Sequence, residues 1–322
     1  MRAIFYFLEN TNMKKNMITL FLATVVGLLQ AQSPTVSEAV KSGTPAIENA
    51  LLWKITGNGL KQNSYLFGTI HLIPKADFRI PPNVDKTFKD CQQAVFEVNM
   101  EEMTDQSAQI GLLMKSMMRG DSTLKDLVSP VDYKLLEAEF EKMKMPLAMF
   151  ERMKPMFLSA MMVGDGKPMP ADEGMNMDDM KSYEVELMQL AQMQNKTIKG
   201  LETIDFQMSV FDSIPYKTQA KMLIDGLKSK SSGDDEYKKM VELYKKQDIN
   251  AMQKVFDDDQ TGMAAFEGLL LVRRNKAWIA TMEKMMSEKP CFFAVGAGHL
   301  GGTTGVVALL RKAGYDVRAE KQ

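Results

Sequence analysis

The chain is poor in the residues that build most disulfide and cofactor sites. Its 322 residues include 2 histidines, 2 cysteines and 2 tryptophans. Cys91 and Cys291 can form one disulfide at most, which excludes a small scaffold held together by disulfides. Both cysteines precede apolar, strand-like runs in which a free thiol could be buried, so the sequence leaves their pairing open.

An excess of charge of one sign is also missing. Lys and Arg total 40 and Asp and Glu total 41, which gives a formal net charge of −1. This balance gives no electrostatic reason to expect a nucleic acid or an anionic membrane as partner. Beyond the N-terminal segment, no stretch reaches about 18 consecutive apolar residues, so we expect no membrane span in the mature chain. A peptide or a small molecule is the partner that these exclusions leave.

The N-terminal segment has the pattern of an export signal. Lys14 and Lys15 precede an uncharged apolar run, Met17–Leu29, which is too short to cross a membrane as a helix. We therefore interpret residues 1–31 as a signal peptide, with Met13 as the start, and expect a periplasmic or secreted protein. An uncleaved N-terminal anchor is the alternative.

The rest of the chain predicts one α/β domain over residues 47–322, after a polar linker at 32–46. LLWKIT and SYLFG read as two strands, and Gly57-Asn58-Gly59 between them is typical of a hairpin turn. Later strand-like runs alternate with helical stretches, which predicts a mixed, mostly parallel sheet with an N-terminal β-hairpin. These later runs are Ala94–Val98, Thr197–Leu201, CFFAV and YDVRA.

A large Met-rich helical insertion is expected at about 101–195. Within it, Ser129 and Pro130 are favourable at a helix start, with Asp132 at the third helical position. Val163–Asp178, rich in Gly and Pro, reads as a flexible loop, and the polar run at 229–239 reads as a solvated one. Most of the 29 methionines are typical of packing at helical spacing.

The two histidines share one motif. Gly68-Thr69-Ile70-His71 and Gly296-Ala297-Gly298-His299 each follow an apolar strand and place the histidine three residues after a glycine. Open α/β sheets bind ligands at the carboxyl ends of their strands, and Gly68, Gly296 and Gly298 allow sharp backbone turns there. A lone histidine would more often be a packed core residue, but the shared motif favours a functional pair.

Carboxylates near strand ends extend this candidate site. Glu97 lies in the apolar run AVFEV, where burial is costly unless the carboxylate is paired, metal-bound or protonated. Two histidines and one carboxylate are a common set for a divalent metal. Glu202 lies at the end of another strand. It could hold one of the site residues in place, or it could cap the next helix. Alternatively, Glu97 occupies a solvent-facing strand position, and Arg274 and Asn275 form part of a solvated helix face.

In this order, the segments resemble the TraB/GumN family, which is related to the TIKI metalloproteases and more distantly to erythromycin esterase-like and haem-binding ChaN-like proteins. The resemblance rests on LLWKITGNGLKQNSYLFGTIHLI, VFEVNM, KTIKGLETIDFQ, LLVRRNKAWIATM and FFAVGAGHLGGTTGVVALLRKAGYDV. It implies an active site made of two motif histidines, a strand glutamate and an Arg-Asn pair, with a divalent metal such as manganese or cobalt. In this chain those residues are His71, Glu97, Arg274, Asn275 and His299.

The chain departs from the family pattern at several positions. Asn99 stands where the family often has Asp, and Ser182-Tyr183-Glu184 stands where it has a sequence closer to Gly-x-Asp. GHLGGTTG differs from the common Pro-Gly-Glu version of the second motif.

Together these features predict a metal-dependent, protease-like hydrolase. His71, Glu97 and His299 would hold a divalent ion (Mn, Co or Zn), and Arg274 and Asn275 would stabilise a developing oxyanion. One alternative is a metal-free, esterase-like hydrolase with a histidine as base. The other is a protein that binds haem or another ligand without turnover.

Overall fold

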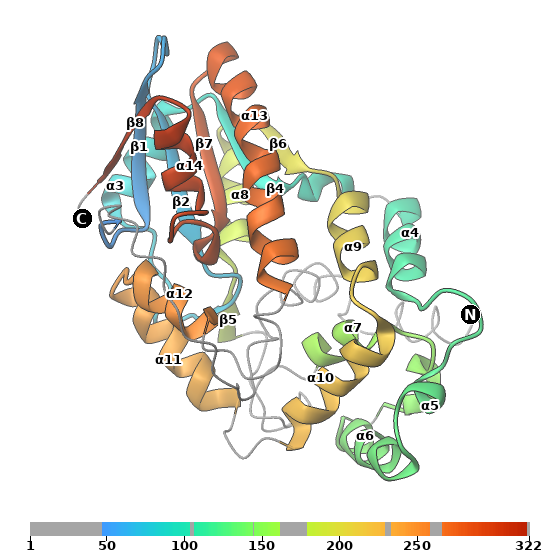
Figure 1. The fold of residues 1–322 in the computed structure, drawn as a ribbon. Coiled ribbons are helices and arrows are strands. Elements are labelled where there is room, and N and C mark those ends of the chain that lie inside the picture. Colours follow the sequence, from blue (N-terminus) through green and yellow to red (C-terminus); the bar gives the residue numbers. More distant parts are fainter. Residues whose placement is uncertain are drawn as a thin grey trace.

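The computed structural model describes residues 47–103, 106–143, 145–161, 179–228, 233–257 and 266–320. Its centre is a six-stranded sheet in the order β6-β4-β7-β2-β1-β8 (Figure 1). Three of the strand pairs, β6 with β4, β4 with β7 and β7 with β2, are parallel, whereas β1 runs antiparallel to β2 and β8. The predicted α/β class with a mixed, mostly parallel sheet is therefore confirmed. The strands are β1 (Leu52–Gly57), β2 (Ser64–Thr69), β4 (Gln93–Val98), β6 (Thr197–Glu202), β7 (Cys291–Gly296) and β8 (Tyr315–Ala319).

The hairpin of β1 and β2 depends on its turn. Gly57, Asn58 and Gly59 have φ angles of 81°, 46° and 78°, in the left-handed region that glycine adopts freely and asparagine tolerates. Every residue of β2 and β4 is buried, as expected for central strands that are covered on both faces. The predicted N-terminal hairpin is confirmed, and it brings β2 next to the strand β7 from the far end of the chain.

Helices cover both faces of the sheet, with α13 and α14 in front and α3 and α8 behind it in Figure 1. Trp53, Phe67, Trp278 and Phe292 are among the buried side chains that fill the space between the layers. A π-helical turn, η5, leads into α13, and a 3₁₀ turn, η6, leads from β7 toward α14. The bounds are α3 (Pro82–Asp90), α8 (Tyr183–Met193), η5 (Gly268–Val272), α13 (Arg273–Glu288), η6 (Ala297–His299) and α14 (Val306–Lys312).

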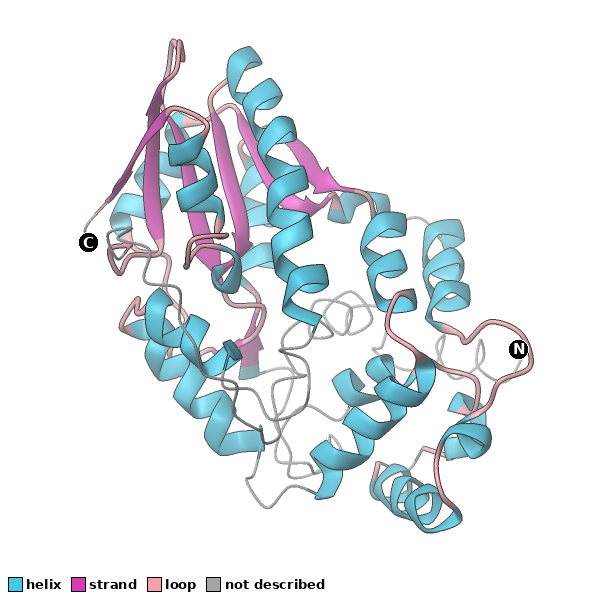
Figure 2. Ribbon diagram, viewed as in Figure 1, coloured by secondary structure: helices cyan, strands magenta, loops and turns pink. Residues whose placement is uncertain are grey.

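A second hydrophobic cluster lies in a helical part that begins just after β4 (Figure 2). It contains Phe140, Phe157 and Phe211, which come from three different helices. At the start of one of them, Ser129 Oγ accepts a hydrogen bond from the Asp132 amide at 3.1 Å, as predicted. The elements of this part are η1 (Met100–Met103), α4 (Gln106–Ser116), α5 (Leu124–Leu127), α6 (Pro130–Lys142), η2 (Leu147–Phe150), α7 (Pro155–Met161), α9 (Ile204–Asp212) and α10 (Tyr216–Lys228).

The remaining elements in the described part of the chain are two short strands and two helices, and both helices contribute buried side chains to the first cluster. A short pair of strands, β3 (Ile73–Pro74) and β5 (Met180–Lys181), joins the segment after His71 to the segment before α8. Helices α11 (Gly233–Lys245) and α12 (Ile249–Asp257) follow α10. The predicted solvated loop at 229–239 is wrong from residue 233 onward, because α11 begins there.

Some predictions fall outside the described residues. The signal peptide, the linker at 32–46 and the loop at 163–178 all consist of residues that the structure does not describe. In the part of the chain that the structure describes, no helix is both long and apolar enough to span a membrane. Within that part Cys91 and Cys291 are buried free thiols, and burial raises the pKa of each to about 12.

Candidate active site at the carboxyl edge of the sheet

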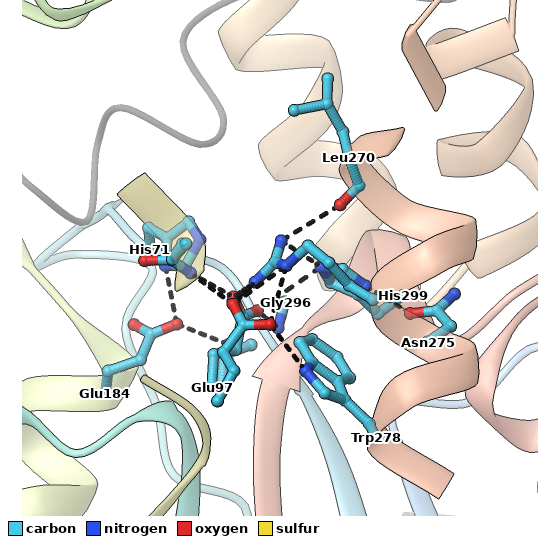
Figure 3. Close-up of polar contacts among 12 residues, drawn as sticks. His71, Glu97, Glu184, Leu270, Asn275, Trp278, Gly296 and His299 are labelled. Atoms are coloured by element: carbon cyan, nitrogen blue, oxygen red, sulfur yellow. Dashed lines mark hydrogen bonds and ion pairs between the residues drawn. The ribbon is translucent and has the colours of Figure 1, made fainter. Parts of the chain in front are cut away.

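Four neighbouring strands end at one edge of the sheet and supply the predicted site. His71 follows β2, His299 lies in η6 after β7, Glu97 is the penultimate residue of β4, and Glu202 ends β6. Because β6, β4, β7 and β2 are adjacent and parallel, their carboxyl ends meet. The side chains of all four residues are less than a tenth exposed to solvent. Figure 3 shows His71 and His299 on opposite sides of Glu97.

The motif glycines make room for this arrangement in different ways. A β-carbon on Gly68 would lie 2.5 Å from Leu300 Cδ1 and 3.2 Å from Ala297 Cα, so this glycine lets the two motifs pack together. A β-carbon on Gly296 would lie 3.3 Å from Glu97 Oε1, 3.7 Å from His299 Cδ2 and 3.8 Å from His71 Nε2. The bare α-carbon of Gly296 thus leaves a small space that the two imidazoles and the carboxylate share. We call this space the Gly296 cradle.

Glu97 is fixed by charge and by the backbone. Its Oε1 accepts a hydrogen bond from the Gly296 amide at 2.9 Å, and its Oε2 lies 2.6 Å from Arg274 Nη2. Burial alone would raise the pKa of Glu97, but Arg274 and the histidines outweigh that effect and hold the pKa far below its ordinary value. Glu97 is therefore a carboxylate, and the alternative of a solvent-facing position is wrong.

Arg274 bridges two of the carboxylates. Its Nη2 also lies 2.7 Å from Glu202 Oε1, and its Nη1 donates to the Leu270 carbonyl at 3.2 Å. That carbonyl belongs to the π-helical turn η5, a type of turn often found at functional sites. Arg274 and Asn275 are each 2% exposed, so they do not form a solvated helix face. The neighbouring Arg273 is the exposed residue of this segment.

Glu202 contacts Arg274 through both of its carboxylate oxygens. Besides its bidentate contact with Arg274, it accepts a hydrogen bond from Trp278 Nε1 at 2.9 Å. Gln207 Nε2 donates to both Glu202 and Glu97, at 3.2 and 3.3 Å. Burial raises the pKa of Glu202, although Arg274 opposes the shift. The position of Glu202 fits the supporting role that the sequence suggested, with no direct contact to either histidine among the described interactions.

Asn275 fixes the protonation of His299. Its Nδ2 donates to the Thr304 carbonyl at 3.0 Å, so its Oδ1 faces His299 Nδ1 at 2.6 Å and accepts the ring proton. The lone pair of Nε2 therefore faces the site, 3.2 Å from Arg274 Nη1 and 3.7 Å from Glu97 Oε1. Burial lowers the pKa of His299 to about 3, which keeps the imidazole neutral.

Glu184 plays the corresponding part for His71. Glu184 Oε1 lies 2.8 Å from His71 Nδ1, and both side chains are about 5% exposed. Neither ring nitrogen of His71 has a hydrogen-bond partner of acceptable geometry among the described residues, so its link to Glu184 is a close charged contact. Burial opposes the charged imidazole, but Glu184 outweighs it, so the pKa of His71 is raised. Sequence reasoning recorded Glu184 only as a departure from the family pattern and did not place it in the site.

The buried cluster has an excess of negative charge. Glu97 and Glu202 contact the guanidinium of Arg274, whereas Glu184 contacts the imidazole of His71. With both imidazoles neutral, two negative charges remain without a counterion, and burying them is costly. The cluster therefore favours a bound cation or a proton on His71.

The donor atoms are of the types that bind divalent cations, but they are not already arranged around one. His71 and His299 each have Nδ1 anchored by an oxygen and Nε2 directed toward the site, which is the usual arrangement of metal-ligating histidines. Among the described residues, however, no three His, Cys, Asp or Glu side chains already form a metal-binding group. The Arg274 guanidinium, in contact with both Glu97 and His299, occupies part of the space around these donors.

The fold and this site define a mixed α/β protein with two buried histidines on the carboxyl edge of its sheet. The chain belongs to the TraB/PrgY/gumN family, whose model matches residues 51–319. It is also similar to a protein named Metalloprotease TIKI1 from Danio rerio, with 23% identity. That alignment covers 88% of this chain and 66% of the relative, so the chain spans just under two thirds of it. No solved structure matches significantly.

Proposed function

We propose that the protein is a hydrolase of peptide or amide-like bonds that uses a divalent cation at the Gly296 cradle. The observation that carries the proposal is the convergence of His71, Glu97 and His299 on this cradle, with both histidines anchored through Nδ1. The similarity to the Danio rerio protein named Metalloprotease TIKI1 supports hydrolysis of peptide bonds and a metal requirement.

His71 Nε2, His299 Nε2 and an oxygen of Glu97 are the atoms that would hold the cation. Manganese, cobalt and zinc all accept such a mixed set of nitrogen and oxygen ligands. When bound, a cation of this kind supplies Lewis-acid polarisation and lowers the pKa of water. A charge of +2 also matches the two uncompensated negative charges of the cluster, which gives the protein its own reason to bind one.

Arg274 is the residue that we assign to the developing negative charge of the substrate. Its guanidinium is buried and held by Glu97 and Glu202, so it needs little reorganisation when charge develops beside it. Asn275 does not share this role in our proposal, because both ends of its amide are already engaged, by His299 and by Thr304. We assign Asn275 to the orientation of His299.

One observation favours a second candidate, a hydrolase without metal. Arg274 already places a fixed cation against Glu97 and His299, and Glu184 orients His71 as it would orient a general base. In that case His71 would remove a proton from water, and Arg274 would stabilise the oxyanion. Glu184, in place of Glu97, would then be the carboxylate that orients the base.

We further propose that the protein acts outside the cytoplasm. The export pattern of residues 1–31 supports this, and the peptide or small-molecule substrate would be met there. The location of the protein can be read by fractionating cells that express the full chain. Mass spectrometry of its N-terminus would show cleavage after Ala31 if the signal peptide is removed.

The deciding measurement is metal content and affinity. Purified protein is stripped with a chelator and titrated with Mn²⁺, Co²⁺ and Zn²⁺ in a calorimeter, beside His71→Ala. Stoichiometric binding that the variant loses, together with peptidase activity that the cation restores, supports the first candidate. Peptidase activity that neither chelator nor cation changes supports the second, and absence of hydrolysis of any peptide or amide substrate with the cation bound contradicts both.

A further inference from the structure

We infer that Glu184 is a positioning residue that holds the ring proton of His71 on Nδ1 and so keeps Nε2 directed at the Gly296 cradle. The inference deepens the proposed function and rests on it for its catalytic meaning. Its structural content, the tautomer of His71, can be tested without any substrate or metal.

The Glu184 carboxylate is held from three directions. Its Oε1 accepts a hydrogen bond from Thr69 Oγ1 at 2.6 Å and lies 2.8 Å from His71 Nδ1, while its Oε2 accepts from Ser182 Oγ at 2.9 Å. Figure 3 shows the carboxylate beside the imidazole. With two hydroxyl donors, the adjoining imidazole and 4% exposure, this carboxylate has little freedom to turn away.

The donors come from two different elements and fix their relative position. Thr69 ends β2, two residues before His71, so the strand that carries the histidine also holds its partner. Ser182 is the N-cap of α8 and accepts a hydrogen bond from the Val185 amide at 3.4 Å. Glu184 therefore lies in the first turn of α8, where the helix dipole favours a negative charge. Burial raises the pKa of Glu184, but His71 and Thr69 outweigh burial and lower it.

A carboxylate at this place decides which ring nitrogen carries the proton. Both Glu184 oxygens accept from hydroxyl groups, so the carboxylate is an acceptor toward His71 as well and favours a proton on Nδ1, 2.8 Å from Oε1. When the ring is neutral, Nε2 therefore presents its lone pair to the cradle, 3.8 Å from the position of a β-carbon on Gly296. Without an acceptor at Nδ1, the proton would shift to Nε2, where the nearby Glu97 carboxylate attracts it. That tautomer has no free lone pair directed at the cradle.

The chain is well suited to a direct test, because His71 and His299 are its only histidines. The full-length protein, purified without a histidine tag, is labelled with ¹⁵N-histidine, and the proton on each ring nitrogen is read by NMR over a range of pH. We expect a proton on Nδ1 of both histidines throughout. The spectrum of His71→Asn assigns the signals, and His299 serves as the internal reference because Asn275 fixes its tautomer independently.

Three variants separate positioning from general damage. Glu184→Met removes the acceptor at similar side-chain length, and we expect the neutral His71 ring to carry its proton on Nε2. Glu184→Gln keeps an oxygen that can accept from Nδ1, and we expect the wild-type tautomer. Glu139→Met is the matched control, because Glu139 is buried in α6 with an ion pair to Lys142 and lies outside the site. In all three, His299 keeps its proton on Nδ1.

Cation affinity gives the second readout. We expect Glu184→Met to weaken Mn²⁺ binding by about 10- to 100-fold and Glu184→Gln to weaken it less. A wild-type His71 that carries its proton on Nε2 alone overturns the inference, even if Glu184→Met fails to fold. So does an unchanged tautomer in folded Glu184→Met. If the wild type binds no cation, the metal-dependent proposal fails, whereas the NMR result still decides the role of Glu184.

Discussion

The guanidinium of Arg274 lies between two buried carboxylates, with Nη2 2.6 Å from Glu97 Oε2 and 2.7 Å from Glu202 Oε1. Glu97 is the penultimate residue of β4, Glu202 ends the neighbouring strand β6, and the arginine comes from α13. One positive charge thus ties the sheet edge to the helix that covers it. The same group contacts His299 Nε2, so the link that stabilises the fold also bounds the candidate site.

Replacing this arginine should cost both stability and activity. Arg274→Met leaves Glu97 and Glu202 buried without their counter-charge, and the free energy of unfolding should fall by about 3–5 kcal/mol. Urea unfolding followed by circular dichroism measures the loss. Arg273→Met is the matched control, since Arg273 is exposed and should change stability by no more than about 0.5 kcal/mol. Equal stability of the two variants would show that the Arg274 bridge has no net stabilising effect.

The sequence was sufficient to find the strand-end residues of the site. His71 and His299 stand after apolar runs with a glycine three residues before each, and Glu97 interrupts such a run with a charge. All three signals are local, and parallel pairing of β4, β7 and β2 is enough to bring them together. The fold class followed for the same reason, because strand and helix periods alternate along the chain.

Residues that depend on distant partners were harder to recognise. Arg274 lies on a helix, where a charged side chain ordinarily faces water, and its burial is explained only by the carboxylates of two other strands. Glu184 meets Thr69 across 115 positions of sequence, so no local pattern marks it. The signal available was its departure from the family's Gly-x-Asp. The start of helix α11 was predicted as a loop because it is polar and lies ahead of the buried Met240, Val241 and Tyr244, which are spaced as one helical face.

The glycines of the second motif offer a test of the cradle. Gly296→Ala would place a β-carbon 3.3 Å from Glu97 Oε1 and within 4 Å of both imidazoles, where the cation is proposed to bind. We expect Mn²⁺ to raise the thermal midpoint of the wild type but not that of Gly296→Ala. At 100 times the dissociation constant the wild-type stabilisation should be about 2.7 kcal/mol.

Gly298→Ala serves as the control for that experiment. A β-carbon on Gly298 meets no atom within 4 Å, so this variant should respond to Mn²⁺ as the wild type does. An equal response of Gly296→Ala and the wild type would place the cation away from the cradle. Differential scanning fluorimetry over a range of Mn²⁺ concentrations resolves the three proteins.

Both histidines should be required for turnover but not for folding. His71→Ala and His299→Ala each remove one of two converging ring nitrogens, and we expect activity to fall by about 100-fold or more. Far-ultraviolet circular dichroism and cooperative thermal unfolding verify that the fold is retained. The near-ultraviolet signal of Trp278 is unsuitable for His299→Ala, because that ring packs against His299 with centroids 4.5 Å apart. Turnover near the wild-type rate in either folded variant would exclude that histidine from the reaction.

The two cysteines should be unreactive in the folded protein. Burial raises the pKa of Cys91 and Cys291 to about 12, so almost no thiolate is present at pH 8, and neither side chain is reachable by solvent. Unfolding exposes the thiols and returns each pKa to about 8.5, where thiolate forms readily. Iodoacetamide at pH 8 should therefore leave the native protein unmodified and add two labels in denaturant without a reductant. A reductant requirement for labelling the unfolded chain would instead reveal a disulfide, and it would contradict the free thiols of the structure.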